Sequence, residues 1–360
     1  MRNHQATSGF LTLLLLLGPA ASASAAGGRA AAKAGSPSAD KDNDYRVTIL
    51  VSNEEDEAPV QDPKLVNAWG IAASSSSPWW VADNGTGFST LYTGDGVKLG
   101  LEVQVPGAPT GVLFNTSSQF QLASDTPARF LFASEDGTFS GWNPAVNPNA
   151  IVVFSDPGSV YKGLAIHGDT LYSTDFGECK VESFHGNFFN NTFVQFDTPG
   201  GFEDRSIPAG YCPFGIQAIG DSIFVTYAKK EGIDDVAGVG HGFVREFDAD
   251  GHLLASVASH GLLNSPWGLA LAPADFGKFG GCLLVGNFGD GRINAYCRNN
   301  GDQWHHAGHL RQHRHTLVID GLWGIGFGNG QASGPTNVLY FAAGPDDETN
   351  GYFGKIEVAP

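Results

Sequence analysis

A short motif recurs six times along this chain of 360 residues. Each copy has an aromatic or small residue, then a glycine, then an aliphatic residue. The copies are Ala68-Trp69-Gly70-Ile71, Pro109-Thr110-Gly111-Val112, Tyr161-Lys162-Gly163-Leu164, Pro213-Phe214-Gly215-Ile216, Pro266-Trp267-Gly268-Leu269 and Leu322-Trp323-Gly324-Ile325. Their glycines lie 41, 52, 52, 53 and 56 residues apart, which is about the length of one propeller blade. The repeat therefore predicts an all-β, six-bladed β-propeller with four-stranded blades.

Each motif is followed by a second apolar strand, a polar turn that contains glycine, and a third strand. Residues 79–82 lead into the turn 83–85, and residues 283–285 lead into the turn 287–291. Asn, Asp and Gly tolerate positive φ, so these segments are typical of hairpin turns. The sixth copy has no outer strand after it, while residues 45–51 form a strand-like run without a partner. We expect residues 45–51 to supply that strand and close the ring, which protects the sheet edges.

The composition agrees with this interpretation. The chain has 49 glycines, 25 phenylalanines and only 16% charged residues, as expected for a turn-rich protein packed with aromatic side chains. Its formal net charge of −17 argues against a nucleic-acid partner, because phosphate binding relies on clustered Lys and Arg. We expect the charge to keep the protein soluble, and we expect a monomer.

The N-terminal 25 residues have the pattern of a signal peptide. Arg2 and His4 precede the apolar run 10–17, and small residues follow it. Cleavage after Ala23 or Ala25 fits the A-x-A pattern. A secreted, extracellular protein is therefore expected.

The rest of the chain divides into two predicted parts. Residues 26–44 lack periodicity and are expected to form a disordered leader, and residues 45–360 are expected to form the propeller. No later stretch of the sequence reaches the roughly 20 apolar residues of a transmembrane helix. Three sequons begin at Asn84, Asn115 and Asn190, and they would carry glycans only in a eukaryotic host with a glycosylating secretory route.

Three longer runs carry a resemblance to known proteins. Residues 65–70 (LVNAWG), 78–87 (PWWVADNGTG) and 318–324 (VIDGLWG) look like the marks of a secreted propeller family of uncharacterised function. With its Gly-aliphatic strand starts and its D-N-G and N-F-G-D-G turns, the chain resembles the NHL class of six-bladed propellers over residues 45–360. That class includes lyases, lactonases, a strictosidine synthase group and binding modules. The resemblance therefore implies a fold and leaves the chemistry open.

Four cysteines in an exported chain suggest two disulfides, with free buried thiols as the alternative. Cys282 begins the second strand of blade five and Cys297 ends the third, so the two should face each other across a hairpin. Cys179 follows the turn of blade three and Cys212 precedes the first strand of blade four, which puts both near one rim. We predict the pairs Cys179–Cys212 and Cys282–Cys297.

The loops that enter the innermost strands share one face of a propeller with the turns between the second and third strands. We call this the site face. Trp69, Trp267 and Trp323 would make half of its channel mouth aromatic, with Asn84 and Asn287 as further ligand-binding candidates. The tryptophans would either stack on a small molecule or glycan, or pack between the blades.

Acidic and amide side chains gather on the same predicted face. The set is Asp83, Asn84, Glu135, Asp136, Asp175, Glu178, Asn287, Asp290 and Asp346. Ca²⁺ prefers such oxygen ligands, so Asp83, Asp136, Asp175 and Asp290 are candidate ligands of a divalent cation. Asp and Asn are also the usual residues of hairpin turns, which is the alternative explanation.

Histidines offer two further candidates. Five crowd into residues 303–315 and could bind Zn²⁺ or Cu²⁺, but this segment maps to the outermost strand of blade five, where a solvated edge is the alternative. His241 ends an insertion at 229–240 between the second and third strands of blade four. It would lie on the site face as a candidate general base, and the insertion would be either a lid or a disordered loop.

The sequence leaves three functions open. The first is a secreted binding or scaffold propeller whose small polar ligand, such as a carbohydrate, sits on the aromatic and acidic rim. The second is a divalent-metal-dependent lyase or lactone hydrolase in which rim carboxylates hold the cation and His241 transfers a proton. The third, an envelope-associated interaction protein, would need a large exposed apolar patch. Serine-hydrolase, zincin, phosphate-loop and kinase motifs are absent from the sequence.

Overall fold

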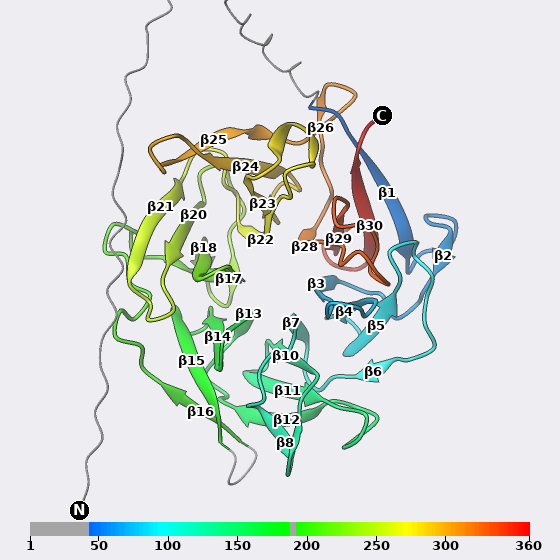
Figure 1. The fold of residues 1–360 in the computed structure, drawn as a ribbon, viewed down its shortest axis with the longest axis vertical. Helices are drawn as coiled ribbons and strands as arrows, with labels where there is room; N and C mark the ends of the chain where they lie inside the picture. Colours follow the sequence, from blue (N-terminus) through cyan, green and yellow to red (C-terminus); the bar gives the residue numbers. More distant parts are fainter. Residues whose placement is uncertain (1–42, 188–191) are drawn as a thin grey trace, which may run out of the picture. The chain divides into compact units, whose positions relative to one another are not determined.

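A computed structural model describes residues 43–187 and 192–360, and in these residues six sheets radiate from one axis (Figure 1). Blade one contains β3 (Ala68–Ala72), β4 (Trp79–Asp83), β5 (Phe88–Tyr92) and β6 (Val103–Gln104). Blade two contains β7 (Pro109–Phe114), β10 (Phe130–Ser134), β11 (Thr138–Trp142) and β12 (Ile151–Ser155), with a small ribbon of β8 (Gln121–Ala123) and β9 (Thr126–Pro127). Blade three contains β13 (Tyr161–His167), β14 (Thr170–Asp175), β15 (Lys180–Asn187) and β16 (Thr192–Phe196).

The second half of the ring repeats this order. Blade four contains β17 (Tyr211–Ile219), β18 (Ser222–Glu231), β20 (Gly242–Phe247) and β21 (Leu253–Ser259), with β19 (Asp234–Asp235) paired to β18. Blade five contains β22 (Pro266–Leu271), β23 (Leu283–Asn287), β24 (Ile293–Arg298) and β25 (Trp304–His309), followed by a ribbon of β26 (Arg311–Gln312) and β27 (His315–Thr316). Blade six contains β28 (Leu322–Phe327), β29 (Leu339–Ala343), β30 (Tyr352–Val358) and β1 (Tyr45–Ser52), with β2 (Val60–Gln61) beside β1. The predicted all-β, six-bladed propeller is confirmed, and the helix of the described residues is one 3₁₀ turn at Gly277–Phe279.

The ring closes as the sequence predicts. β1 pairs antiparallel with β30, from Tyr45 opposite Val358 to Ser52 opposite Tyr352. Segments from the two ends of the chain therefore share one blade, and Figure 1 shows the blue β1 beside the red β30. This pairing covers the edge that β30 would otherwise expose.

The motif glycines explain why the repeat exists. A Cβ atom at Gly70 would lie 2.5 Å from the Thr110 carbonyl oxygen of the next blade, and one at Gly268 would lie 2.5 Å from the Trp323 carbonyl oxygen. Similar approaches join the other innermost strands around the ring. Only glycine lets six innermost strands come this close, so the motif marks where neighbouring blades touch at the axis.

The core lies between neighbouring blades. Trp80 of blade one, for example, packs on Phe130 and Trp142 of blade two, with ring centroids 4.0 and 4.7 Å away. Because each sheet is covered on both faces by its neighbours, its inner strands are almost fully buried.

Both predicted disulfides are present. Cys179–Cys212 joins the turn after β14 to the start of β17, and Cys282–Cys297 bridges the β23–β24 hairpin of blade five. The free-thiol alternative is excluded for these four residues.

The predictions for the N-terminal segment, for membrane spans and for the sequons have the following outcomes. The predicted signal peptide, residues 1–25, and residues 26–42 of the predicted leader lie outside the described residues, as does the sequon residue Asn190. In the described ranges, no helix has the length and apolar character needed to cross a bilayer. The amides of the sequon residues Asn84 and Asn115 are both engaged, in hydrogen bonds to Glu135 and to the Ala128 carbonyl oxygen.

Candidate functional site

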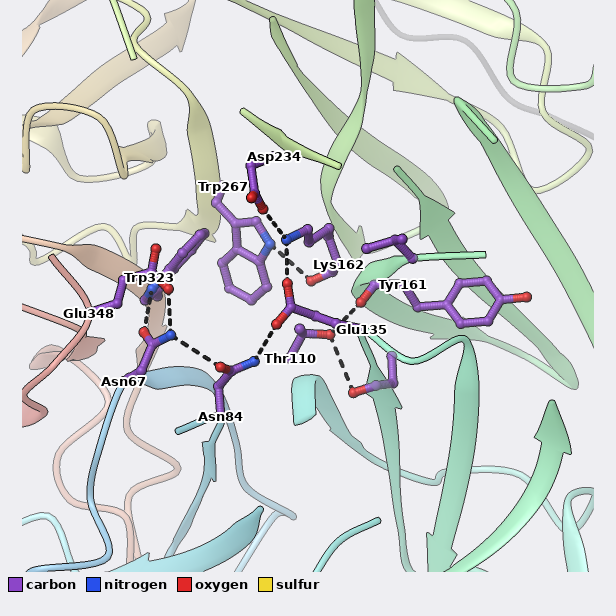
Figure 2. A network of polar contacts seen from close by, with 12 residues as sticks. Asn67, Asn84, Thr110, Glu135, Tyr161, Lys162, Asp234, Trp267, Trp323 and Glu348 are labelled. Atoms are coloured by element: carbon purple, nitrogen blue, oxygen red, sulfur yellow. Dashed lines mark hydrogen bonds and ion pairs between the residues drawn. The ribbon is translucent and has the colours of Figure 1, made fainter. Parts of the chain in front are cut away.

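A chain of polar side chains crosses the channel mouth on the site face (Figure 2). The Asn67 amide donates to the Asn84 side-chain oxygen at 3.2 Å, and the Asn84 amide donates to a Glu135 carboxylate oxygen at 2.9 Å. The other Glu135 oxygen accepts from Lys162 Nζ at 2.5 Å, and Lys162 Nζ also lies 3.3 Å from an Asp234 oxygen. These residues come from blades one to four, so the ring closure itself assembles the network.

Blade six completes the network through Glu348, in the turn after β29. The Asn67 amide donates to a Glu348 carboxylate oxygen at 2.5 Å, and the Asn67 side-chain oxygen accepts from Trp323 Nε1 at 3.1 Å. Asn67 itself has a φ of 46°, a left-handed conformation that Asn tolerates better than most residues. From the loop that enters β3, the Asn67 side chain thus contacts Asn84 in blade one and both Glu348 and Trp323 in blade six.

Lys162 is the central cation of this site. Its side chain is only 3% exposed, and burial of an unpaired ammonium would be costly. Glu135 and Asp234 supply the opposite charges, and Nζ also lies 5.0 Å from the centre of the Trp69 ring. The Trp267 indole N–H donates to the Lys162 carbonyl oxygen at 3.0 Å, which ties blade five to the same residue.

Beneath the network the three predicted tryptophans are packed together. Trp69 and Trp323 stack with centroids 3.7 Å apart, Phe288 stacks on the far side of Trp323 at 3.9 Å, and Trp267 meets Trp323 edge-on. Trp69 and Trp323 are 2% and 1% exposed, whereas Trp267 is partly exposed. The first two therefore form the floor of the site, and Phe288 presents aromatic surface to the cavity beside it.

The channel is nearly closed below this floor. At the level of the motif glycines it holds a cavity of about 30 Å³, lined by Gly70, Gly111, Gly268 and Gly324 together with Trp267. The site face therefore carries a blind site rather than the opening of a continuous pore.

A larger cavity of about 320 Å³ lies beside the floor. Phe288, Asp320, Asp347 and Glu348 line it, together with small residues of the surrounding turns. Burial raises the pKa of Glu348 above its ordinary value, while the Asn67 hydrogen bond and the nearby Lys162 charge act in the opposite direction. The wall of this cavity is thus rich in hydrogen-bond acceptors.

The turn that carries Glu348 has an unusual backbone. Asp346, Asp347 and Glu348 have φ values of 56°, 53° and 65°, all in the left-handed region. Each such residue costs of the order of 1 kcal/mol, and such conformations cluster at functional sites. The turn directs two of its acidic residues, Asp347 and Glu348, to the wall of the cavity.

The insertion of blade four is an ordered hairpin. β18 continues to Glu231, and β19 pairs back on it with Asp235 opposite Lys230. This hairpin carries Asp234 to Lys162 and places Asp235 in a half-buried position, where desolvation raises its pKa. His241, at the end of the insertion, has its Nδ1 2.8 Å from the Val236 carbonyl oxygen. Its predicted role in proton transfer stays a prediction.

The four predicted metal ligands do not converge. Asp83 is fully buried beside Thr90, the Asp136 carboxylate accepts from Thr138, and the Asp290 carboxylate accepts from the Asn287 amide. Asn287 is buried, and its amide also donates to the Leu262 carbonyl oxygen. Their functions as ligands stay predictions.

One carboxylate group among the described residues has the spacing for an ion. It consists of Asp175, Glu178 and Glu182, whose oxygens lie within 4.8 Å of one another. Lys180 Nζ already lies 2.5 Å from Glu178 and 2.7 Å from Glu182, so two of these carboxylates have a cationic partner. The five histidines of residues 303–315 do not belong to any such group in the described ranges.

The interpretation of the sequence missed four members of the network: Asn67, Lys162, Asp234 and Glu348. For Lys162 a signal existed, because it precedes the motif glycine at a position where the other copies have Trp, Thr or Phe. A single charged residue at one position of a six-fold repeat indicates a specialised blade.

This geometry defines the class of the protein as a six-bladed β-propeller with a blind polar site at one mouth of its central channel. No established family profile matches the chain. It is 33% identical over 330 residues to uncharacterized protein R648 of Acanthamoeba polyphaga mimivirus, covering 87% of this chain and 80% of that protein. It is also 33% identical over 332 residues to uncharacterized protein L690 of the same virus, covering 87% and 85%. The chain belongs to the family of these two proteins.

A solved structure supports the fold. The soluble aldose sugar dehydrogenase of Escherichia coli aligns with a TM-score of 0.52 over 88% of this chain and all of that one. Its sequence identity of 14% shows a common fold alone.

Proposed function

We propose that this protein binds a small hydroxyl-rich molecule of the carbohydrate type at the mouth of the site face. The observation that carries the proposal is the polar network, in which side chains of five blades converge above an aromatic floor. A structural role alone would not require a buried lysine, a left-handed acidic turn and a partly exposed aromatic ring in one place.

The chemistry of the cavity suits such a ligand. Asp320, Asp347 and Glu348 offer carboxylate oxygens to hydroxyl donors, and the partly exposed ring of Phe288 offers an apolar surface to a sugar ring. The volume of about 320 Å³ is at the lower end of the range for small-molecule sites. Within this proposal Lys162 is a positioning residue, because its buried ammonium holds Glu135 and Asp234 in place.

Isothermal titration calorimetry against a panel of neutral mono- and oligosaccharides tests the proposal. For a sugar that binds, Glu348→Gln should weaken the affinity about tenfold, because it replaces a carboxylate acceptor in the cavity wall and charged hydrogen bonds are the stronger ones. Glu357→Gln is the matched control, since Glu357 lies on β30 in an ion pair with Arg46. An unchanged affinity in the Glu348 variant, or the absence of saturable binding across the panel, would contradict the proposal.

We also propose that the protein is secreted. The predicted signal peptide supports this, as do the two disulfides, which form and persist in oxidising compartments. Expression in a secreting host, followed by mass spectrometry of the medium, should find a mature N-terminus at residue 24 or 26. Retention of the full chain inside the cells would contradict it.

A second candidate is a divalent-metal-dependent lyase or lactone hydrolase. The group of Asp175, Glu178 and Glu182 favours it, because Asp175 is buried and one of its oxygens has no hydrogen-bond partner among the described residues. If an ion binds, these three residues would hold it, and Lys180 would have to move away. Elemental analysis and a melting scan, before and after EDTA, separate the candidates: a stoichiometric ion with a lower Tm after EDTA supports the metal site, and no ion with an unchanged Tm removes it.

A further inference from the structure

The channel has a second mouth on the face opposite the site face, and it opens into a further cavity. This cavity has a volume of about 570 Å³. All six innermost strands contribute to its wall through the residues that follow their motif glycines. The polar network, in contrast, takes Asn67 and Lys162 from positions that precede those glycines, so the two sites lie at opposite ends of the same strands.

The side chains that line the second cavity are mostly apolar. The residues directly after the motif glycine provide an aliphatic ring: Ile71, Val112, Leu164, Leu269 and Ile325. No charged side chain is found among the described residues that line it, and its polar members are Ser74, Ser75, Thr116, Gln217 and Asn329. The Asn329 amide donates to the carbonyl oxygens of Ser74 and Ser77, so this polar side chain already has partners within the protein.

The cavity ends blindly at the glycine constriction. Only a space of about 30 Å³ lies between it and the aromatic floor of the site face. A molecule that enters from this side therefore meets a narrow end formed by the backbone of the motif glycines, and its binding would be independent of the carbohydrate site.

We propose that this second mouth is a binding site for a neutral, apolar small molecule. The volume of about 570 Å³ lies within the range of small-molecule sites, which are concave, largely apolar and equipped with few polar groups. The ligand is neutral because the wall offers no Lys or Arg to an anion and no Asp or Glu to a cation. A blind, concave wall built by six strands suits a small molecule rather than the flat surface of a protein partner.

A fluorescence titration with the neutral probe N-phenylnaphthylamine tests the site. We expect saturable binding with one site per chain, and binding at least about fivefold weaker for the anionic probe anilinonaphthalene sulfonate. Equal affinity for the two probes, or no saturation with the neutral one, would overturn the proposal without any variant.

Two matched variants locate the binding. Leu271 lines the cavity at its lip and is 48% exposed, so Leu271→Glu should fold and weaken the neutral probe about tenfold by placing a carboxylate in the apolar wall. Leu253 on the outer strand β21 is 43% exposed, and Leu253→Glu should leave the affinity within about twofold. Melting scans confirm that both variants are folded. An equal effect of the two substitutions would show that the probe binds elsewhere.

Discussion

At the scale of single residues, Lys162 shows how one position of a repeat acquires a specific role. It stands directly before a motif glycine, where three other blades have tryptophan. The surrounding tryptophans exclude water from its side chain, so its charge depends on Glu135 and Asp234. The Lys162 ammonium in turn holds both carboxylates at the mouth of the site.

Replacement of Lys162 by methionine tests this interdependence. Lys162→Met keeps the apolar stem and removes the ammonium, which leaves Glu135 without its cation. We expect the free energy of unfolding to fall by about 1–3 kcal/mol, below the cost for a fully buried pair, because Glu135 and Asp234 are 28% and 70% exposed. Urea denaturation measures the change. Arg46→Met removes a surface ion pair as the control and should cost less than about 1 kcal/mol.

Asp83 predicts a dependence of stability on pH. It is fully buried, and burial raises its pKa well above the ordinary value, with the nearby Asp62 charge adding to the shift and Thr90 opposing it. The folded state therefore binds the Asp83 proton more tightly than the unfolded state does. The contribution of Asp83 to stability is complete below about pH 4 and is lost as the pH rises through its folded-state pKa.

The variant Asp83→Asn removes this titration. Relative to the native protein, its free energy of unfolding should rise between pH 5 and pH 8, because the native protein alone bears the growing cost of ionising a buried carboxyl group. Asp136 stands in the corresponding turn of blade two but is exposed, so Asp136→Asn is the control. Parallel pH profiles for the native protein and Asp83→Asn, from urea denaturation at each pH, would contradict the expectation.

At the scale of elements, the innermost strands carry both the repeat and the channel. Their glycines face the next blade's backbone, and the aliphatic residues after them line the opposite cavity. Predictions from sequence succeeded here because the signal lies within short segments. The two disulfides were predictable for a related reason, since strand order alone brings Cys282 opposite Cys297 and Cys179 near Cys212.

Substitution of a motif glycine by alanine should destabilise the protein more than the same substitution at an ordinary glycine. Gly268→Ala would place a Cβ 2.5 Å from the Trp323 carbonyl oxygen, so it should lower the free energy of unfolding by about 1–3 kcal/mol. Gly100→Ala is the control, because nothing lies within 4 Å of the added Cβ. It should be nearly neutral or slightly stabilising. Equal Tm values for the two variants would rule out close contact at the axis.

At the scale of the whole molecule, stability depends on the closure of the ring by β1. A chain that begins at residue 53 lacks β1 and leaves the edge of β30 unpaired. We expect it to have a lower Tm and to aggregate during size-exclusion chromatography, because an exposed strand edge pairs with other chains. A chain that begins at residue 43 keeps β1 and serves as the control. A monomeric chain from residue 53 with an unchanged Tm would show that closure contributes little.

The sequence by itself determined the number of blades, the closing strand and the disulfide pairs, because each follows from the spacing and order of strands along the chain. It also indicated the face on which Trp69, Asn84 and Glu135 meet. Only the tertiary structure decided that Trp69 and Trp323 are buried as a floor, that Asp83, Asp136 and Asp290 stay apart, and that Glu348 belongs to the site. These outcomes depend on which side chains from five separate blades reach one another across the axis, and no pattern within a single blade contains that information.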